Sequence, residues 1–201
     1  MGASDYFCKW ILGIQGTTTY HIGSFDDLKK IPRFKNRTYI LEERIQQHPT
    51  MSSLNPNSVN TIRMTTVREG TSVAVFEHWM RMSIGNSYVD NSHSGGISII
   101  VKDDGSLETT ARQLRTGAQF ERHPLTGVKF SDVKIPFWED AKALALRAHR
   151  CLYSMHSVGW DVAITPYGPI LLEGNTTWDM RIVPQLSDEL PDRYEKYFGK
   201  K

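Results

Sequence analysis

Two carboxylates and one amide near the carboxyl end of the chain have the types and spacing of a magnesium site. Asp161 lies in an apolar run, residues 159–164, and Glu173 and Asn175 lie in a second run, residues 170–175. The segment between the runs contains two prolines and a glycine, so the runs are predicted to form a β-hairpin. An all-oxygen set of this kind suits Mg²⁺, which fills its other positions with water and phosphate oxygens. The pattern therefore predicts a magnesium site on this hairpin.

The apolar pattern also predicts the register of the hairpin, because a slip by one residue would mix apolar and polar side chains on both faces. The expected pairs are Ile164 with Ile170, Val162 with Leu172, Asp161 with Glu173 and Trp160 with Gly174. The apolar face would then consist of Trp160, Val162, Ile164, Ile170 and Leu172. The two carboxylates would face each other on the opposite side, where they repel unless a cation lies between them. Solvated residues on an exposed hairpin face are the alternative.

The rest of the chain combines strand patterns with two helical ones. Strands are expected over residues 6–12, 38–41, 58–67, 71–82, 95–102 and 106–110, with a three-residue turn at 68–70 and a loop at 46–57. Ser24, followed three residues later by Asp27, predicts the start of a short helix. One long helix is expected over residues 137–155, where apolar residues recur at intervals of three and four: Trp138, Ala141, Ala145, Ala148 and Leu152. Strands with helices packed on them make the class α+β.

Composition restricts the classes of partner. The chain has 201 residues and a net charge of +2, and its basic residues are scattered among acidic ones, which argues against a nucleic-acid partner. No apolar run is long enough for a membrane span and no signal peptide is visible, so a cytoplasmic location is expected. The two cysteines, Cys8 and Cys151, imply no disulfide framework. The length suits one domain or two small lobes that share a cleft.

Several sequence motifs of the chain resemble those of a known family. Asp161, followed at a spacing of twelve by Glu173-Gly174-Asn175, resembles the metal-binding hairpin of ATP-grasp enzymes. Four further motifs are similar to the sugar-transfer-associated ATP-grasp family, which is related to α-L-glutamate ligases: residues 58–63, Asp90-Asn91 with Gly95-Gly96, His123-Pro124 with Thr126-Gly127, and Gly159-Trp160-Asp161. The resemblance covers residues 7–185. It implies an ATP-grasp fold, with two small lobes of mainly antiparallel sheet and packed helices, and nucleotide in the cleft between them.

The resemblance also implies roles for individual residues. Residues 1–45 would form the glycine-loop lobe and hinge, and residues 46–201 the catalytic lobe that binds Mg-ATP. ATP would be contacted by Lys9, Gly13, Gly16, Glu42, Glu43, Ile45 and Asn60, magnesium would be held by Asp161, Glu173 and Asn175, and Arg63 and Arg81 would be catalytic. Thr17 stands where the family often has lysine. Local alternatives are an exposed Lys9 at a strand edge and a cross-strand ion pair of Arg63 with Glu77. The resemblance assigns no defined role to Asp90, Asn91, His123 or Trp178.

The implied reaction is ATP-dependent ligation, with ATP and Mg²⁺ as cofactors and a small-molecule carboxylate or sugar-linked compound as substrate. The carboxylate would become an acylphosphate that an amine or similar nucleophile opens, in cell-surface polysaccharide or related biosynthesis. A kinase on the same fold and a non-catalytic nucleotide-binding module are the alternatives. The N-terminal region that ATP-grasp ligases usually carry is expected to be missing here. The 201-residue chain alone is therefore expected to bind ATP without turnover.

Overall fold

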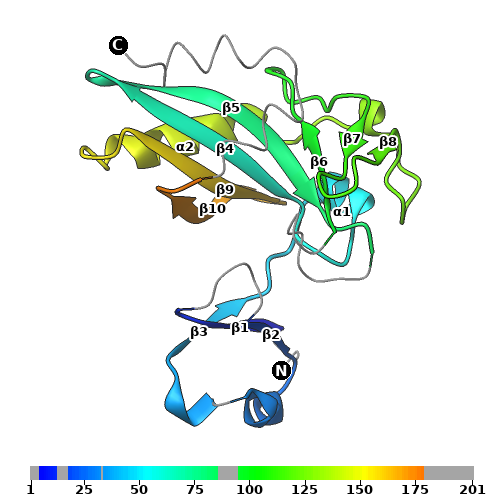
Figure 1. Ribbon diagram of the computed structural model, residues 1–201, viewed down its shortest axis with the longest axis vertical. Helices are drawn as coiled ribbons and strands as arrows, with labels where there is room; N and C mark the ends of the chain where they lie inside the picture. Colours follow the sequence, from blue (N-terminus) through cyan, green and yellow to red (C-terminus); the bar gives the residue numbers. More distant parts are fainter. Residues whose placement is uncertain (1–4, 13–17, 33, 86–94, 179–201) are drawn as a thin grey trace. The chain divides into compact units, whose positions relative to one another are not determined.

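The structure of the chain is a computed structural model that describes residues 5–12, 18–32, 34–85 and 95–178 (Figure 1). The chain divides into two compact units, Met1–Gln46 and Gln47–Lys201. Each unit is built on one sheet, and every strand pair in both sheets is antiparallel. Helices pack on these sheets, so the α+β class expected from the sequence is confirmed.

The first unit holds a three-stranded sheet in the order β2-β1-β3. Its strands are β1 (Tyr6–Trp10), β2 (Thr19–Ile22) and β3 (Tyr39–Glu43), and two 3-10 helices follow β2, η1 (Phe25–Lys30) and η2 (Phe34–Asn36). The backbone N–H of Ser24 donates to Asp27 Oδ2 at 2.9 Å, so the predicted helix start is confirmed. Cys8 packs with Ile22 and Ile31 in a small core. Alternation along β1 places Lys9 on the other face of this sheet.

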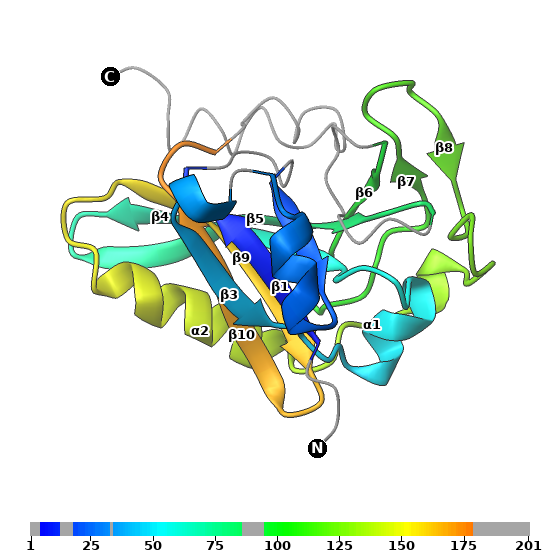
Figure 2. The same ribbon diagram turned by 90° about the horizontal axis from the view of Figure 1, so that it is seen from below.

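The second unit holds a seven-stranded sheet in the order β10-β9-β4-β5-β6-β7-β8. Its strands are β4 (Thr61–Glu69), β5 (Ser72–Met82), β6 (Ile97–Ile100), β7 (Ala111–Arg112), β8 (Gln119–Phe120), β9 (Ser157–Thr165) and β10 (Gly168–Asn175). Its helices are α1 (Pro49–Leu54), the 3-10 helix η4 (Phe130–Asp132) and α2 (Trp138–Arg150). Figure 2 shows α2 running alongside β4, β9 and β10, and it also contacts β5.

The core of the second unit lies on one face of this sheet. Aligned rows of apolar residues cross it, with Ile62 paired to both Met80 and Val162 and Met80 paired to Ile99. Against these rows α2 packs Trp138, Ala141 and Ala145. Burial of an apolar side chain of this size contributes roughly 1.5–3 kcal/mol, so these rows supply much of the stability of the unit. The residues between them in sequence, including Arg63, Arg81 and Asp161, point to the opposite face.

Several elements differ from expectation for physical reasons. The expected loop at 46–57 contains α1, which the side chain of His48 caps by accepting a hydrogen bond from the Thr50 backbone at 3.1 Å. The expected three-residue turn at 68–70 is a two-residue turn, because Gly70 adopts a φ of 58° and Glu69 pairs with Ser72. The long helix ends at Arg150, and the expected strand at 106–110 is reduced to isolated bridges.

Candidate functional site

Asp161 is the centre of a buried ionic cluster on the face of the large sheet opposite α2. It lies on β9 directly across from Arg63 of β4. Asp161 Oδ1 accepts from Arg63 Nε at 2.6 Å, and Oδ2 accepts from Arg63 Nη2 at 3.3 Å and from Arg81 Nη2 at 2.8 Å. The Asp161 side chain is only 5% exposed, and the two arginines are 12% and 13% exposed. The two arginines predicted to be catalytic therefore converge on one carboxylate.

The electrostatics of the cluster keep Asp161 ionised. Burial alone would raise the pKa of this carboxyl group, but the charges of Arg81 and Arg63 outweigh burial and hold the pKa below its ordinary value. The ion pair with Glu77 that the sequence left open for Arg63 is replaced by the pair with Asp161. Because two arginines share one buried carboxylate, the three groups together carry a net positive charge. The carboxylate fixes the position of both guanidinium groups at this face.

Glu173 completes an acidic pair with Asp161. The two residues are partners in the register of β9 and β10, so their predicted opposition is confirmed. Asn175 Nδ2 donates to Glu173 Oε1 at 3.0 Å and to Gly159 O at 3.4 Å, which leaves the amide oxygen outside both bonds. Unlike Asp161, Glu173 is exposed. The set thus offers oxygen donors of the kind Mg²⁺ takes, and one of its members is already held by arginines.

Nearer the turn, the predicted register of this hairpin is wrong. Ile170 pairs with Ala163 and Leu171 with Val162, and a bulge between Leu171 and Glu173 then restores the expected pairing of Asp161. Leu171 packs against the core, whereas Ile170 and Leu172 are each 37% exposed. The cause is a two-residue turn in which Gly168, at φ 126°, already begins β10. The bulged residue makes up the difference.

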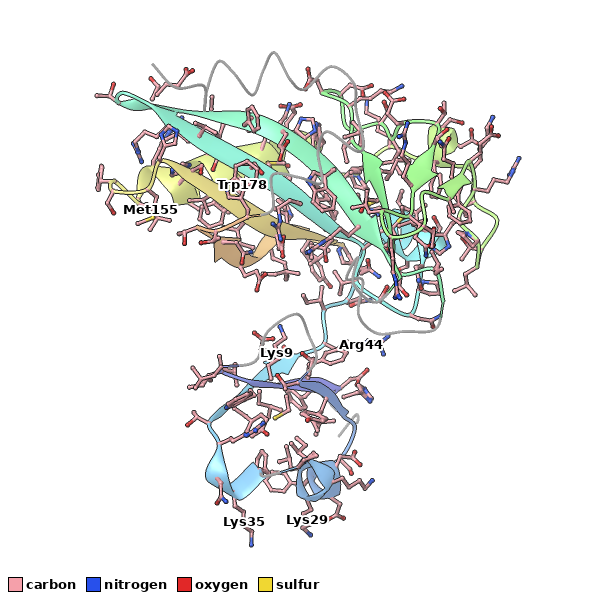
Figure 3. All side chains as sticks on the ribbon, in the orientation of Figure 1. Lys9, Lys29, Lys35, Arg44, Met155 and Trp178 are labelled. Carbon is pink, nitrogen blue, oxygen red and sulfur yellow. The ribbon has the colours of Figure 1, made fainter. Side chains whose placement is uncertain are left out.

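Trp178 is a neighbour of the cluster to which sequence reasoning gave no role. A Cβ placed on Gly159 would lie 2.9 Å from Trp178 Cβ and 3.3 Å from Arg63 Cδ. Trp178 Nε1 donates to Ser157 Oγ at 3.1 Å, which anchors the indole beside β9 (Figure 3). The glycine therefore allows the indole and the arginine stem to approach the strand. A glycine inside a strand indicates a close approach to its backbone, so Gly159 is the sequence signal that could have indicated this contact.

In the first unit, Lys9 and Glu42 form the corresponding polar pair. Lys9 Nζ lies 2.5 Å from Glu42 Oε2, on the sheet face away from the small core, and both side chains are about half exposed. Figure 3 labels Lys9 at this sheet. Glu43 ends β3, and Ile45 follows it in the chain. The structure brings Lys9 and Glu42 together, and the nucleotide contacts predicted for these four residues stay predictions.

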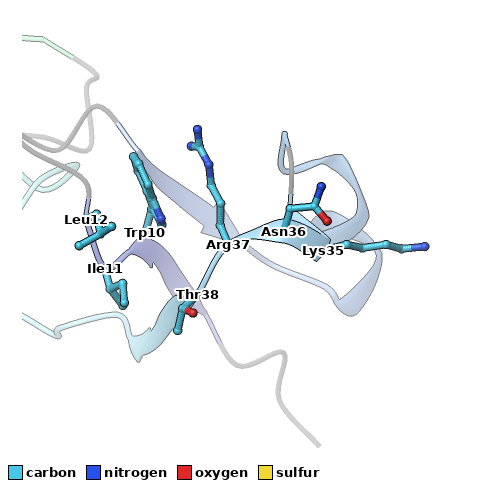
Figure 4. Close-up of a pocket in the computed structure, with 7 residues that line it drawn as sticks. All are labelled: Trp10, Ile11, Leu12, Lys35, Asn36, Arg37 and Thr38. Carbon is cyan, nitrogen blue, oxygen red and sulfur yellow. The ribbon is translucent and has the colours of Figure 1, made fainter.

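An open hollow of about 610 Å³ lies at the end of β1, lined by Trp10, Lys35, Arg37 and their chain neighbours (Figure 4). Arg37 Cζ lies 3.9 Å from the centroid of the Trp10 ring, a cation–π contact. None of the predicted site residues that the structure describes lines this hollow. The predicted loop glycines Gly13 and Gly16 lie outside the described residues, as does Thr17.

Asn60 and His123 are buried and hydrogen-bonded within the second unit. Asn60 Nδ2 donates to Met51 O at 2.7 Å and to Asn55 O at 3.0 Å, which ties the start of β4 to α1. The nucleotide contact predicted for Asn60 stays a prediction. His123 Nδ1 accepts from a backbone N–H and its Nε2 lies 2.9 Å from Ser83 O, while burial lowers its pKa. His123 is therefore a neutral, structural histidine. Asp90 and Asn91 lie outside the described residues.

Two features of the described part of the chain limit the alternatives. It contains no group of three or more His, Cys, Asp or Glu residues placed to hold a metal ion. None of the helices in the same residues is both long and apolar enough to cross a membrane.

Comparison with known proteins identifies the family and the fold. A family model described as "sugar-transfer associated ATP-grasp" matches residues 31–190. Among solved structures, the ATP-grasp ligase PsnB, complexed with a phosphomimetic variant of a minimal precursor, Mg and ADP, is similar with a TM-score of 0.50 and 14% sequence identity. The similarity covers 92% of this chain and 42% of that chain. No curated protein matches. The fold expected from the sequence is confirmed.

Proposed function

The chain belongs to the sugar-transfer associated ATP-grasp family, and from that premise we propose that it provides the nucleotide-binding and catalytic part of an ATP-dependent ligase. The observation that carries the proposal is the acidic pair Asp161 and Glu173 beside two convergent arginines, Arg63 and Arg81. Two carboxylates and two guanidinium groups bring the local charge close to zero. Such a cluster can exchange partners with a magnesium-bound polyphosphate without leaving a buried charge unpaired.

We assign Asp161, Glu173 and Asn175 to magnesium and Arg63 and Arg81 to the transferred phosphoryl group. When bound, Mg²⁺ would offset phosphate charge and orient the γ-phosphate for in-line attack. The exposed Glu173 and the Asn175 amide oxygen are open to a metal that arrives with nucleotide. The arginines stabilise charge that develops on the phosphoryl oxygens, and their attachment to Asp161 fixes their position in advance. That PsnB was solved with Mg and ADP supports the choice of magnesium and an adenine nucleotide as the bound molecules.

The proposed chemistry has two steps. A substrate carboxylate oxygen attacks the γ-phosphorus, the bond from that phosphorus to the bridging oxygen breaks, and ADP leaves. An amine nitrogen then attacks the acyl carbon of the acylphosphate, phosphate leaves, and the amine loses a proton. Neither step needs a nucleophilic side chain. We place the substrate in cell-surface polysaccharide or related biosynthesis, and the words "sugar-transfer associated" in the family description support a link to sugar transfer.

In the first unit we assign Lys9 to the α- and β-phosphates and Gly13 and Gly16 to a loop that approaches phosphate through backbone N–H groups. Glu42, Glu43 and Ile45 are assigned to the adenosine end of the nucleotide, and Asn60 of the second unit is assigned to the nucleotide without a defined contact. Lys9 shares its charge with Glu42 at 2.5 Å, so nucleotide binding would exchange one anionic partner of this lysine for another.

The test is to trap the acyl intermediate with hydroxylamine. The complete ligase to which the chain would contribute this part is incubated with ATP, magnesium and pooled small carboxylates, and ADP and hydroxamate are measured. We expect both products from the parent and neither from Glu173→Gln, because an acylphosphate is a mixed anhydride that a strong amine opens. Arg147→Gln, at an exposed position of α2, is the control and should behave like the parent.

The alternatives predict other products. A kinase would leave the γ-phosphate on a stable hydroxyl ester without hydroxamate. A binding module would take up Mg-ATP and release no ADP with any added carboxylate. Either result would overturn the ligase assignment.

A further inference from the structure

A row of polar residues extends from the ionic cluster across the large sheet to β8. Arg81 of β5 pairs with Ser98 of β6, Ser98 pairs with Arg112 of β7, and Arg112 pairs with Gln119 of β8. Residues paired in an antiparallel sheet point to the same face, with Cβ atoms roughly 4.5–5.5 Å apart. Arg81 and Arg112 thus flank Ser98 on the face that carries Asp161, with about 10 Å between their Cβ atoms.

The hydroxyl group of Ser98 is unusual for a residue that has only a structural role. It interrupts the apolar strand Ile97–Ile100, it is completely buried, and its Oγ has no hydrogen-bond partner among the described residues. A buried hydroxyl without a partner destabilises a fold, and alanine would fill the same place without that cost. An unsatisfied donor between two guanidinium-bearing positions is instead suited to an oxyanion, which accepts from all three groups.

Arg81 connects this row to the phosphoryl site. Its Nη2 donates to Asp161 Oδ2 at 2.8 Å, and its guanidinium group carries five N–H donors on three nitrogens. An oxyanion at Ser98 would therefore lie next to the phosphoryl group that Arg63 and Arg81 are assigned to hold. A carboxylate that attacks phosphorus must occupy such a neighbouring position.

We propose that Arg81, Ser98 and Arg112 form the subsite for the carboxylate group of the ligase substrate. In it Ser98 donates its hydroxyl hydrogen to one carboxylate oxygen, and Arg81 and Arg112 donate from either side. Arg112 is exposed at the outer end, so the remainder of the substrate extends over β7 and β8. The proposal rests on the function proposed above and specifies the residues that recognise the acid.

The experiment uses acetate as the probe, because the natural acid is not identified. Acetate is titrated into the ¹⁵N-labelled 201-residue chain at constant ionic strength with chloride, and the arginine Nε–Hε signals are followed by NMR. The titration is done with and without saturating Mg-ADP. Arg81 and Arg112 signals are expected to shift together with one dissociation constant, in both conditions. Ser98→Ala should weaken acetate binding about tenfold or more, and Arg112→Gln should abolish it.

A matched control separates recognition from general charge. Arg115 is exposed three residues after Arg112 in the chain and lies outside the row, so Arg115→Gln should bind acetate like the parent. Ser98→Ala should also unfold at the same temperature as the parent or higher, which a structural serine would not do.

Absence of acetate-dependent shifts, or unchanged binding by Ser98→Ala, would overturn the proposal. Displacement of acetate by Mg-ADP would overturn it too, because the row would then hold nucleotide phosphate. Failure of Mg-ADP to bind would instead count against the proposed function, and the acetate titration without nucleotide would still decide the subsite.

Discussion

Replacement of Asp161 by asparagine separates the role of the ionic cluster in stability from its role in the proposed reaction. The change keeps the shape of the side chain and removes its charge. Arg63 and Arg81, whose side chains are 12% and 13% exposed, would lose their shared counter-ion. Arginine does not lose its proton in proteins, so the two charges remain in a poorly hydrated environment.

The magnitude follows from the burial and the three hydrogen bonds. Removal of one partner from a buried ion pair costs about 3–5 kcal/mol. The asparagine oxygen still accepts one of the hydrogen bonds at 2.6 and 2.8 Å, so we expect the lower end, about 3 kcal/mol. With a urea dependence of about 1–3 kcal/mol per molar, the unfolding midpoint should fall by roughly 1–3 M.

The pH dependence of this difference has a definite sign. The pKa of Asp161 in the folded chain lies below its ordinary value, because Arg81 and Arg63 outweigh the opposing effect of burial. A depressed pKa adds stability above the unfolded-state value of about 3.9, and this stability disappears as the pH falls through the folded value. The unfolding free energy of the parent should therefore exceed that of Asp161→Asn by a constant amount from about pH 5 to neutrality. This difference should close below about pH 4.

The assay is urea unfolding followed by tryptophan fluorescence, since four of the five tryptophans belong to Gln47–Lys201. Glu173→Gln is the matched control, because it makes the same chemical change at an exposed position and should alter stability by less than about 0.5 kcal/mol. Equal stability of Asp161→Asn and the parent at pH 7 would refute the view that this carboxylate neutralises two buried arginines. A difference in unfolding free energy between the two proteins that widens at low pH would refute the sign of the Asp161 pKa shift.

Three other substitutions test the remaining parts of the site. Glu173→Gln should abolish magnesium-dependent nucleotide binding, measured by calorimetric titration with Mg-ADP and, for comparison, with ADP and EDTA; unchanged Mg-ADP affinity would exclude Glu173 as a ligand. Gly174→Ala should cost about 1–3 kcal/mol in the urea assay, because its Cβ would lie 2.6 Å from Trp160 Cζ3, whereas Gly85→Ala meets no described residue within 4 Å and should be tolerated. Lys9→Ala should weaken ADP binding about tenfold without lowering stability, and full affinity would remove it from the phosphate site.

The hairpin shows how a sequence can predict a site correctly while its register is partly wrong. Alternation along β9 decides which face each residue takes, and this requires no knowledge of the turn. The expected five-residue connection is in fact a two-residue turn that shifts the pairing by one, and the bulge at Leu172 shifts it back before Glu173. The acidic pair was predictable because it depends on side-chain period. The positions of Ile170 and Leu172 depend on turn geometry, which apolar pattern does not encode.

The surroundings of Asp161 could not be predicted in the same way. Its partners come from β4 and β5, which precede it by 98 and 80 residues, and only the strand order β9-β4-β5 brings them together. A hairpin pattern distinguishes two faces but does not say what covers either of them. Helix α1 was not predicted, and the reason is local. An imidazole cap and a proline at the first position replace the usual serine, threonine or aspartate signal.

The asymmetry between the two carboxylates has a consequence for the interpretation of mutations at this site. In the sequence, Asp161 and Glu173 look equivalent, as two acids opposed on a hairpin. In the structure Asp161 is buried and holds Arg63 and Arg81, whereas Glu173 is exposed and bonded to Asn175. Loss of activity in an Asp161 variant would therefore combine a damaged fold, displaced arginines and a lost metal ligand. Of the two carboxylates, Glu173 can be replaced without removing the counter-ion of the arginines, so its replacement decides whether this sheet face binds magnesium with nucleotide.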